Sequence, residues 1–166
     1  MNEADPRIFC VNIIAQRGNE ILLIRKKNPP AAGELALPGG LVRAGESIET
    51  ACARVLHEET GLRISVDKPV MTGIYSEPDR DPRGPIVSVA FYAKIASRAR
   101  GVAGGDTAEM HWVHAFKGDD LALDHAKMVN DAITRIFHSR KRAAPFRDLS
   151  DKSQRVGRAG RRSEAA

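Results

Sequence analysis

The sequence predicts an α/β domain in which helices cover the faces of a mixed β-sheet, an α/β/α sandwich. Stretches with the composition of β-strands alternate with two stretches that carry the 3.6-residue periodicity of amphipathic helices, and no segment is repeated. The chain has 166 residues, of which 42% are hydrophobic and 28% charged. These values are ordinary for one soluble domain with its own hydrophobic core.

The strands are expected where β-branched and aliphatic residues cluster between turn-forming residues. Gly18 and Asn19 separate the first two clusters and predict a hairpin turn. The predicted strands cover residues 8–15, 20–27, 35–37, 40–42, 64–66, 70–75, 86–95 and 112–113.

The two helices are predicted from their ends as well as from their periodicity. Ser47 suits the N-cap of a helix over 48–60, and Gly61 supplies the residue type that commonly stops a helix. Asp124 suits the N-cap of a second helix over 124–139. The apolar side of the second helix is predicted to consist of Ala126, Val129, Ala132, Ile133, Ile136 and Phe137.

Acidic side chains gather at the end of the first helix and beside a glycine-rich loop that precedes it. Glu58 and Glu59 lie in the last helical turn, while Gly39 and Gly40 allow backbone carbonyls to approach a cation closely. Arg54 lies four residues before Glu58, a spacing at which an ion pair can orient the carboxylate. Because Mg²⁺ prefers oxygen ligands, the pattern predicts a divalent-metal site for phosphate chemistry, with Glu58 and Glu59 as metal ligands.

The stretch 40–62 resembles the signature of the Nudix hydrolases. In that signature a glutamate follows a glycine after five residues, and an Arg-Glu-hydrophobic-any-Glu-Glu-any-Gly-hydrophobic run begins after seven more. The resemblance covers residues 8–138 and implies the α/β/α sandwich of that family. It also implies a Mg²⁺ cofactor, with Mn²⁺ as the alternative. The metal ligands that it implies are the Gly40 carbonyl oxygen, Glu58 and Glu59.

One signature position departs from the family pattern, because Val55 stands where the signature has a glutamate. That glutamate acts as a metal ligand or orients the attacking water, so the base is expected from another loop. Asp106 and Glu109 are candidates, and both are equally compatible with an ordinary turn beside two glycines. The signature glutamate at Glu46 is expected to contact the arginine or a metal-bound water. The predicted catalytic residues are Glu46, Arg54, Glu58, Glu59 and Glu109.

The segment 75–85 is predicted to be a charged loop between two strands, because prolines and a glycine prevent regular structure. It is either a solvated connection or a substrate-binding loop. Its Asp-Arg-Asp-Pro-Arg-Gly sequence resembles the Nudix proteins that act on ADP-ribose, as does the Asp-His pair that opens the last helix. The guanidinium groups of Arg80 and Arg83 then suit a diphosphate or a terminal ribose. Arg25 is assigned to the same substrate-binding role.

The chain is predicted to consist of a Nudix domain over 1–142 and a basic, disordered tail over 143–166. From residue 135 onward there are ten Lys and Arg against three Asp and Glu, although the net charge of the whole chain is +5. Large apolar residues are too few beyond residue 145 for a packed structure. The tail is either a solubilising extension or a segment that attracts nucleic acid and other polyanions.

The remaining composition points to the cytoplasm. No apolar run approaches the length needed to cross a membrane, and the polar N-terminus lacks the layout of a signal peptide. Cys10 and Cys52 lie in apolar surroundings and are expected to be buried thiols. The expected partner is a small nucleoside diphosphate derivative, and the resemblance is compatible with a homodimer.

The function that these features favour is Mg²⁺-dependent hydrolysis of a nucleoside diphosphate linked to another moiety, with ADP-ribose giving AMP and ribose 5-phosphate. A second hypothesis is an ADP-ribose-binding regulator that has lost catalysis, for which Val55 speaks. Regulators of that kind carry a separate DNA-binding domain, and the tail has no helix pattern. A third hypothesis is a hydrolase that removes unwanted nucleoside triphosphates.

Overall fold

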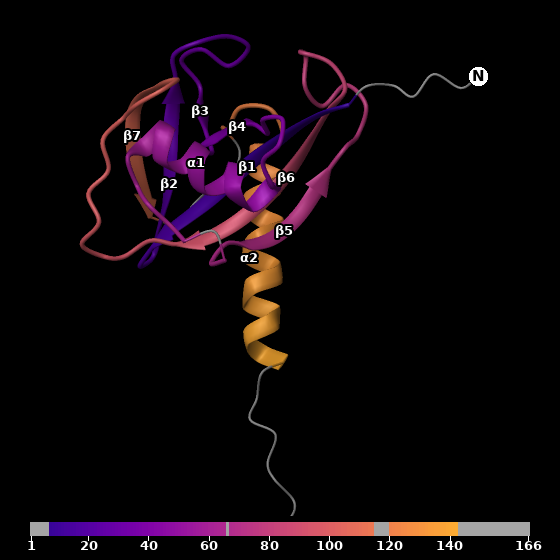
Figure 1. The fold of residues 1–166 in the computed structure, drawn as a ribbon. Coiled ribbons are helices and arrows are strands. Elements are labelled where there is room, and N and C mark those ends of the chain that lie inside the picture. Colours follow the sequence, from indigo (N-terminus) through magenta and orange to yellow (C-terminus); the bar gives the residue numbers. More distant parts are fainter. Residues whose placement is uncertain (1–6, 66, 115–119, 143–166) are drawn as a thin grey trace, which may run out of the picture.

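The fold is built around one long central strand, in a computed structural model that describes residues 7–65, 67–114 and 120–142 (Figure 1). The predicted tail over 143–166 lies outside these residues. In chain order the elements are β1 (Ile8–Arg17), β2 (Glu20–Lys26), β3 (Leu35–Ala36), β4 (Gly39–Leu41), α1 (Ile48–Thr60), β5 (Val70–Tyr75), β6 (Ile86–Lys94), β7 (Thr107–His114) and α2 (His125–Arg142).

The seven described strands form one mixed sheet with the order β3-β2-β1-β6-β5. Strand β1 is parallel to β6 and antiparallel to β2. Strand β4 pairs with the first half of β1, and β7 pairs with β2 on the opposite side of the sheet from β6. Because β1 is ten residues long, it can pair with β4 and β2 one after the other, which brings the glycine-rich loop to the middle of the sheet.

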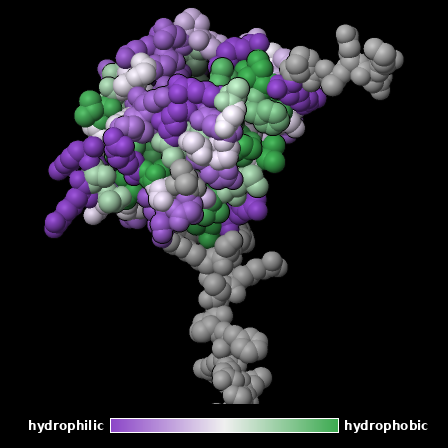
Figure 2. Space-filling model, viewed as in Figure 1, coloured by the Kyte–Doolittle hydropathy of each residue, from purple (hydrophilic) through white to green (hydrophobic). Residues whose placement is uncertain are grey.

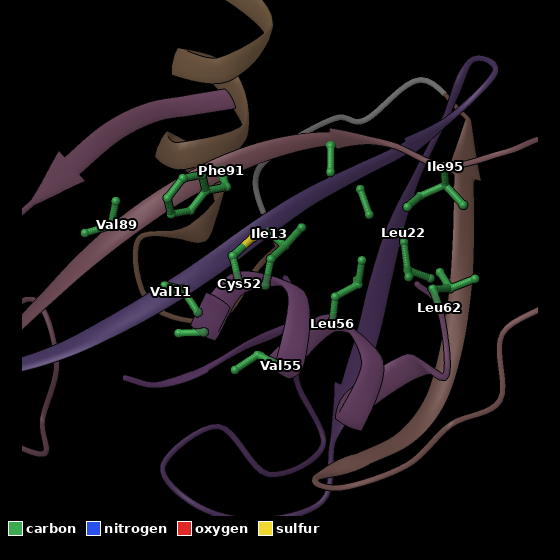
Figure 3. Close-up of a cluster of buried hydrophobic side chains, with 13 residues drawn as sticks. Val11, Ile13, Leu22, Cys52, Val55, Leu56, Leu62, Val89, Phe91 and Ile95 are labelled. Carbon is green, nitrogen blue, oxygen red and sulfur yellow. The ribbon is translucent and has the colours of Figure 1, made fainter. Parts of the chain in front are cut away.

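The two helices cover opposite faces of the sheet, as the alternation of side chains along β1 shows (Figure 1). Val11, Ile13 and Ala15 pack in the cluster that includes α1 (Figure 3), whereas Ile14 packs in the cluster that includes α2. Since β1 is apolar on both faces, it lies at the centre of the domain. The predicted α/β/α sandwich with a mixed sheet is confirmed.

The surface agrees with a domain whose apolar residues are mainly internal. Figure 2 shows that hydrophilic side chains predominate on the side that carries α1. Cys10 and Cys52 are both free and buried, as predicted. Within the described part of the chain, no helix combines the length and the apolar character that a membrane crossing requires.

One local expectation, the strand over 64–66, is wrong. Ile64 and Ser65 do not lie in a strand, although residues 62–65 alternate between inward and outward side chains. Leu62 and Ile64 pack against the core beside α1 without a partner strand, so alternation alone was misleading. In the second helix, Asp124 lies at the predicted N-cap position, directly before His125, and its carboxylate accepts hydrogen bonds from Arg80.

Candidate active site

Helix α1 begins and ends where the sequence predicts. The Ser47 hydroxyl oxygen accepts a hydrogen bond of 3.1 Å from a first-turn amide, and Gly61 adopts a left-handed conformation at the other end. Both ends thereby satisfy backbone groups that a helix leaves without partners. The helix therefore holds its last turn, with Glu58 and Glu59, in a fixed orientation.

The Arg54 side chain joins the helix to the glycine-rich loop before it. Its guanidinium donates to both carboxylate oxygens of Glu46, at 3.0 and 2.5 Å, and to the Leu41 carbonyl oxygen at 2.8 Å. The remaining nitrogen donates to Glu58 at 2.8 Å, which is the i,i+4 contact expected from the sequence. Glu58 also forms an ion pair of 3.1 Å with Arg43. We call Arg54, Glu46, Glu58 and Arg43 the outer ion network.

Glu46 is held in its ionised form by this network. The hydrogen bonds from Arg54, and next the backbone amide of Arg43, lower the pKa of Glu46 to about 2. Its carboxylate therefore stays negative at every physiological pH. The sequence predicts that Glu46 contacts either the arginine or a metal-bound water, and the structure shows the contact with Arg54.

Glu59 points away from the outer ion network, although it is the next residue after Glu58. Successive residues of a helix are rotated by about 100°, which turns Glu59 toward the start of β7. Its carboxylate is buried and accepts hydrogen bonds from the Thr107 hydroxyl at 2.9 Å and from the Asp106 amide at 3.2 Å. The nearest cation is the Lys26 ammonium, 3.9 Å away.

The loop before β7 can approach the helix this closely because it contains two glycines. A β-carbon on Gly104 would lie 2.5 Å from the Glu58 carbonyl oxygen, and the Gly104 amide donates to the Glu59 carbonyl oxygen at 3.0 Å. A side chain at Gly104 would therefore push the loop outward. The glycine thus places Asp106 beside the end of α1.

Asp106 provides a second carboxylate beside Glu59. One oxygen lies 2.5 Å from the Lys26 ammonium, and the other accepts bonds from the Asn28 amide and side chain at 2.9 and 2.7 Å. Burial acts to raise the pKa of Asp106, but the bonds from Lys26 and Asn28 outweigh it and leave the pKa below its usual value. We call Glu59 and Asp106 the inner carboxylate pair, and Lys26 is the lysine that both approach.

Val55 lies on the same face of α1 as Glu58 and Glu59, three and four residues later, and belongs to the hydrophobic core (Figure 3). Its side chain is 2% exposed and packs against the loop, because a β-carbon on Gly40 would lie 3.0 Å from a Val55 methyl group. The position at which the signature has a glutamate is therefore apolar and closely packed here. The inner pair contains Asp106 in addition to the signature residue Glu59.

The donor groups around Lys26 fit a divalent cation in their chemistry. Among the residues that the structure describes, no three His, Cys, Asp or Glu side chains are already arranged to hold a metal ion. Glu59 and Asp106 nevertheless converge on one cation, the Lys26 ammonium, and Gly40 borders the same pocket as Lys26 and Asp106. Carboxylate and carbonyl oxygens are the ligands that Mg²⁺ and Mn²⁺ prefer.

A pocket adjoins the inner carboxylate pair. Its wall includes both glycines of the loop, the start of β1 and the segment before α2. Its lining combines apolar residues with several polar and charged side chains. Those used below are Asn12, Lys26, Arg83, Asp106 and His125.

The floor of this pocket contains a neutral histidine. Burial lowers the pKa of His125 to about 4, and its Nδ1 accepts a hydrogen bond of 3.1 Å from the Leu37 amide. The proton of the neutral ring is therefore on Nε2, which lies 3.1 Å from the Asn12 side-chain amide. Because Nε2 carries the proton, the Asn12 amide is oriented so that its oxygen accepts from Nε2. The Asn12 NH₂ group then occupies the buried position that has no hydrogen-bond partner among the described residues. Asn12 thereby retains a donor for a ligand.

Of the two loop arginines, the structure places one beside the pocket. Arg83 lines it and pairs with Asp81, and its side chain is 44% exposed. The Arg80 guanidinium is buried and engaged by both oxygens of Asp124, at 2.8 and 2.5 Å, and by the Ser88 hydroxyl at 3.1 Å. Arg80 therefore holds the loop against the start of α2, and Arg83 is the loop arginine with surface for a ligand.

Arg25 and Glu109 lie together on the neighbouring strands β2 and β7. Their side chains form an ion pair of 3.1 Å, and Glu109 also contacts His111 at 3.0 Å. Neither residue is among those that line the pocket. The acidic residue that this loop brings to the inner pair is Asp106.

Sequence reasoning overlooked Lys26, Asn12 and the burial of His125. Asn12 lies within the apolar strand β1, where the pattern predicts only an ordinary strand residue. Lys26 lies at the end of β2, where an exposed lysine is common. One signal was available for His125, namely its place at the start of the last helix beside Asp124. Contacts between distant segments, such as His125 with Leu37, carry no local signature in the sequence.

The fold and the paired carboxylates define a hydrolase of the Nudix class. The sequence model of the NUDIX domain family matches residues 5–132, and the chain belongs to this family. It is 41% identical over 122 residues to an ADP-ribose pyrophosphatase of Methanocaldococcus jannaschii, which covers 74% of this chain and 70% of the relative.

Two further comparisons agree with this placement. An ADPR-responsive transcriptional repressor, NtrR, of Acinetobacter baylyi is 35% identical over 80% of this chain, which spans only 52% of that relative. The crystal structure of a MutT/nudix family protein from Enterococcus faecalis has a TM-score of 0.74 and 29% identity. It matches over 83% of this chain and 65% of its own. These comparisons establish the family, in which hydrolases and an ADPR-responsive regulator share one domain.

Proposed function

We propose that this Nudix hydrolase cleaves the diphosphate of ADP-ribose to AMP and ribose 5-phosphate, with Mg²⁺ or Mn²⁺ as cofactor. The observation that carries the proposal is the convergence of Glu59 and Asp106 on one cation position beside a pocket that Arg83 also lines. The name of the relative from Methanocaldococcus jannaschii supports the choice of substrate. The free buried cysteines suit a reducing compartment, and we place the activity in the cytoplasm.

In this proposal, Glu59, Asp106 and the Gly40 carbonyl oxygen hold the metal. A bound divalent ion neutralises phosphate charge and polarises the phosphorus that water attacks. Arg83 contacts the diphosphate, since a guanidinium donates to two phosphate oxygens at once. Arg54 keeps Glu46 and Glu58 in place, so the outer ion network fixes the loop that carries Gly40.

We propose Asp106, rather than Glu109, as the acidic residue from outside the signature. Glu109 lies on β7 and pairs with Arg25, away from the pocket, whereas Asp106 lines the pocket beside Glu59. The water proton passes to a carboxylate of this pair, and the oxygen attacks phosphorus. The bond to the bridging oxygen breaks, and that oxygen leaves on the second phosphate monoester.

The test is product release by the purified full chain from ADP-ribose, NADH, diadenosine polyphosphates and nucleoside triphosphates, with Mg²⁺ and separately with Mn²⁺. Preferred turnover of ADP-ribose to AMP and ribose 5-phosphate supports the proposal. Preferred turnover of a nucleoside triphosphate would support the third hypothesis.

A regulator without catalysis is the second candidate, and Val55 is the observation that favours it. The missing glutamate removes one carboxylate from the signature, and the NtrR relative is named as a repressor that responds to ADPR. Tight binding of ADP-ribose together with no turnover in either metal would identify this regulator. The protein assayed should be the whole chain, because the named repressor is longer than the part matched here.

A further inference from the structure

Lys26, at the end of β2, occupies the position between the two carboxylates of the inner pair. Its ammonium lies 2.5 Å from Asp106 and 3.9 Å from Glu59, and its side chain is 17% exposed. The same residue lines the pocket beside the inner pair. One flexible cation therefore faces both the candidate metal ligands and the candidate substrate pocket.

Every site carboxylate discussed above is matched by a cation of the protein itself. Glu46 and Glu58 are paired within the outer ion network, and Asp106 and Glu59 share Lys26. Val55 adds no negative charge where the family signature has a glutamate. The outer ion network is thus neutralised internally, whereas the two carboxylates of the inner pair share one lysine, and a divalent cation must compete with Lys26 for them.

We propose that Lys26 is an internal counter-ion that leaves the inner carboxylate pair when the divalent cation binds and then contacts a phosphate oxygen of the substrate. This inference rests on the proposed function. Two cations cannot share the same carboxylate oxygens at 2.5 Å without strong repulsion. A lysine can make the transfer, because its compact charge sits on a flexible four-carbon stem.

The destination of the lysine follows from the pocket that it lines. Once Asp106 is used by the metal, the ammonium needs another anionic partner, since its charge is costly to leave partly buried without one. Arg83 already marks the pocket as a place for anionic groups. A diphosphate bound there satisfies Lys26, so binding of the metal and of the diphosphate favour each other.

The neighbouring residue Lys27 provides the matched control. It has the same charge, but its exposed side chain donates to the Gly105 carbonyl oxygen at 3.2 Å and forms no ion pair with Glu59 or Asp106. Lys27→Met therefore removes one positive charge near the site without removing the competitor of the metal. Any effect of overall charge on cation binding will appear in both variants.

The experiment measures Mn²⁺ affinity by calorimetry for the wild-type full chain, Lys26→Met and Lys27→Met, without substrate. We expect Lys26→Met to bind Mn²⁺ more tightly by about fivefold or more, a typical size for coupling between sites. Lys27→Met should differ little from wild type. Thermal unfolding of each variant verifies folding, and Lys26→Gln is measured as a second variant in case the methionine is poorly tolerated.

A second measurement follows the other half of the transfer. The α,β-methylene analogue of ADP-ribose is titrated with and without saturating Mn²⁺, because it binds without being hydrolysed. In wild type, Mn²⁺ should increase the affinity for the analogue by some factor. In Lys26→Met this factor should be at least about fivefold smaller. A lysine that only supports the fold would weaken analogue binding equally in both conditions, and this outcome would overturn the proposal.

The failures of the two proposals can be told apart. Wild-type protein that binds Mn²⁺ and hydrolyses ADP-ribose, with unchanged or weaker Mn²⁺ binding in Lys26→Met, would reject the counter-ion role and leave the function standing. Wild-type protein that binds neither Mn²⁺ nor the analogue would reject both.

Discussion

Glu58 and Glu59 are adjacent in the sequence, yet their carboxylates lie in two different environments. Glu58 belongs to the outer ion network, with a side chain 43% exposed and paired with Arg54 and Arg43. Glu59 is buried against the loop before β7 and approaches Lys26. The comparison shows that one helical step separates a carboxylate that organises a loop from one that is positioned to hold a cation.

The largest expected effect comes from exchanging each glutamate for its neutral isostere. Glu59→Gln should reduce hydrolysis of ADP-ribose by at least about a hundredfold, because it removes charge from the inner pair while keeping the side-chain shape. Glu58→Gln should reduce it by about tenfold, as expected for a residue that orients others. The rates are measured as kcat/KM, with circular dichroism to verify folding. Equal losses in the two variants would remove the distinction drawn here.

Restoring the signature glutamate tests whether a bound cation can reach position 55. Val55→Glu places a carboxylate at a core position that is 2% exposed, and should lower the free energy of unfolding by about 3 kcal/mol without metal. Saturating Mn²⁺ should recover much of this loss if the cation held by the inner carboxylate pair also reaches the new carboxylate.

Urea unfolding with EDTA and with Mn²⁺ measures the effect of Val55→Glu. The matched control is Val55→Gln, which is similar in size but uncharged and should gain nothing specific from the metal. Equal recovery in both variants would show that the cation does not reach position 55.

As the pH falls, the stability contributed by buried His125 should be lost before the stability contributed by Glu46 in the outer ion network. Burial lowers the pKa of His125 from 6.5 to about 4, so the unfolded chain takes up this proton first as the pH falls. Stability should therefore decrease between about pH 6.5 and 4, by on the order of 3 kcal/mol. The pKa of Glu46 is lowered from 4.5 to about 2, so its contribution is lost only between those values.

The measurement is the free energy of unfolding in urea as a function of pH, for wild type and His125→Gln. The variant removes the imidazole and should flatten the dependence between pH 6.5 and 4. Unchanged steepness in His125→Gln would assign the effect to other groups. Charged groups around the ring include Asp124, Arg80 and Lys26, and all three are retained in the variant.

The smallest expected effect concerns the geometry of the outer ion network. Arg54→Lys keeps the charge but cannot contact Glu46, Glu58 and the Leu41 carbonyl oxygen together, and should cost about 1–2 kcal/mol of stability. Arg43→Lys changes an exposed residue that pairs with Glu58, and should stay within about 0.5 kcal/mol of wild type. Urea unfolding of the two variants provides the comparison, and equal costs would show that the fork of Arg54 is unimportant.

Much of the architecture could be predicted because it is written in local patterns. The hairpin turn at Gly18, both ends of α1 and the helices on two faces of the sheet are found as expected. These features depend on residues close in the chain, whose backbone preferences and periodicity act locally. The expected strand over 64–66 is wrong because its alternation had no partner strand to pair with.

The sequence by itself determined the family, the signature helix and the charges available to the site. Spacing along one helix is enough to place Arg54 beside Glu58, since residues four apart are neighbours. The presence of valine at position 55 is likewise a fact of the sequence.

Only the tertiary structure decided which charged residues meet. Arg80 turns to Asp124, Arg83 to the pocket, and Asp106 rather than Glu109 to Glu59. Lys26 reaches the inner carboxylate pair from a strand that is 80 residues from Asp106 in the chain. Such pairings depend on the packing of distant segments, and the burial that results determines which charges can be neutralised, by which partner and at which pH.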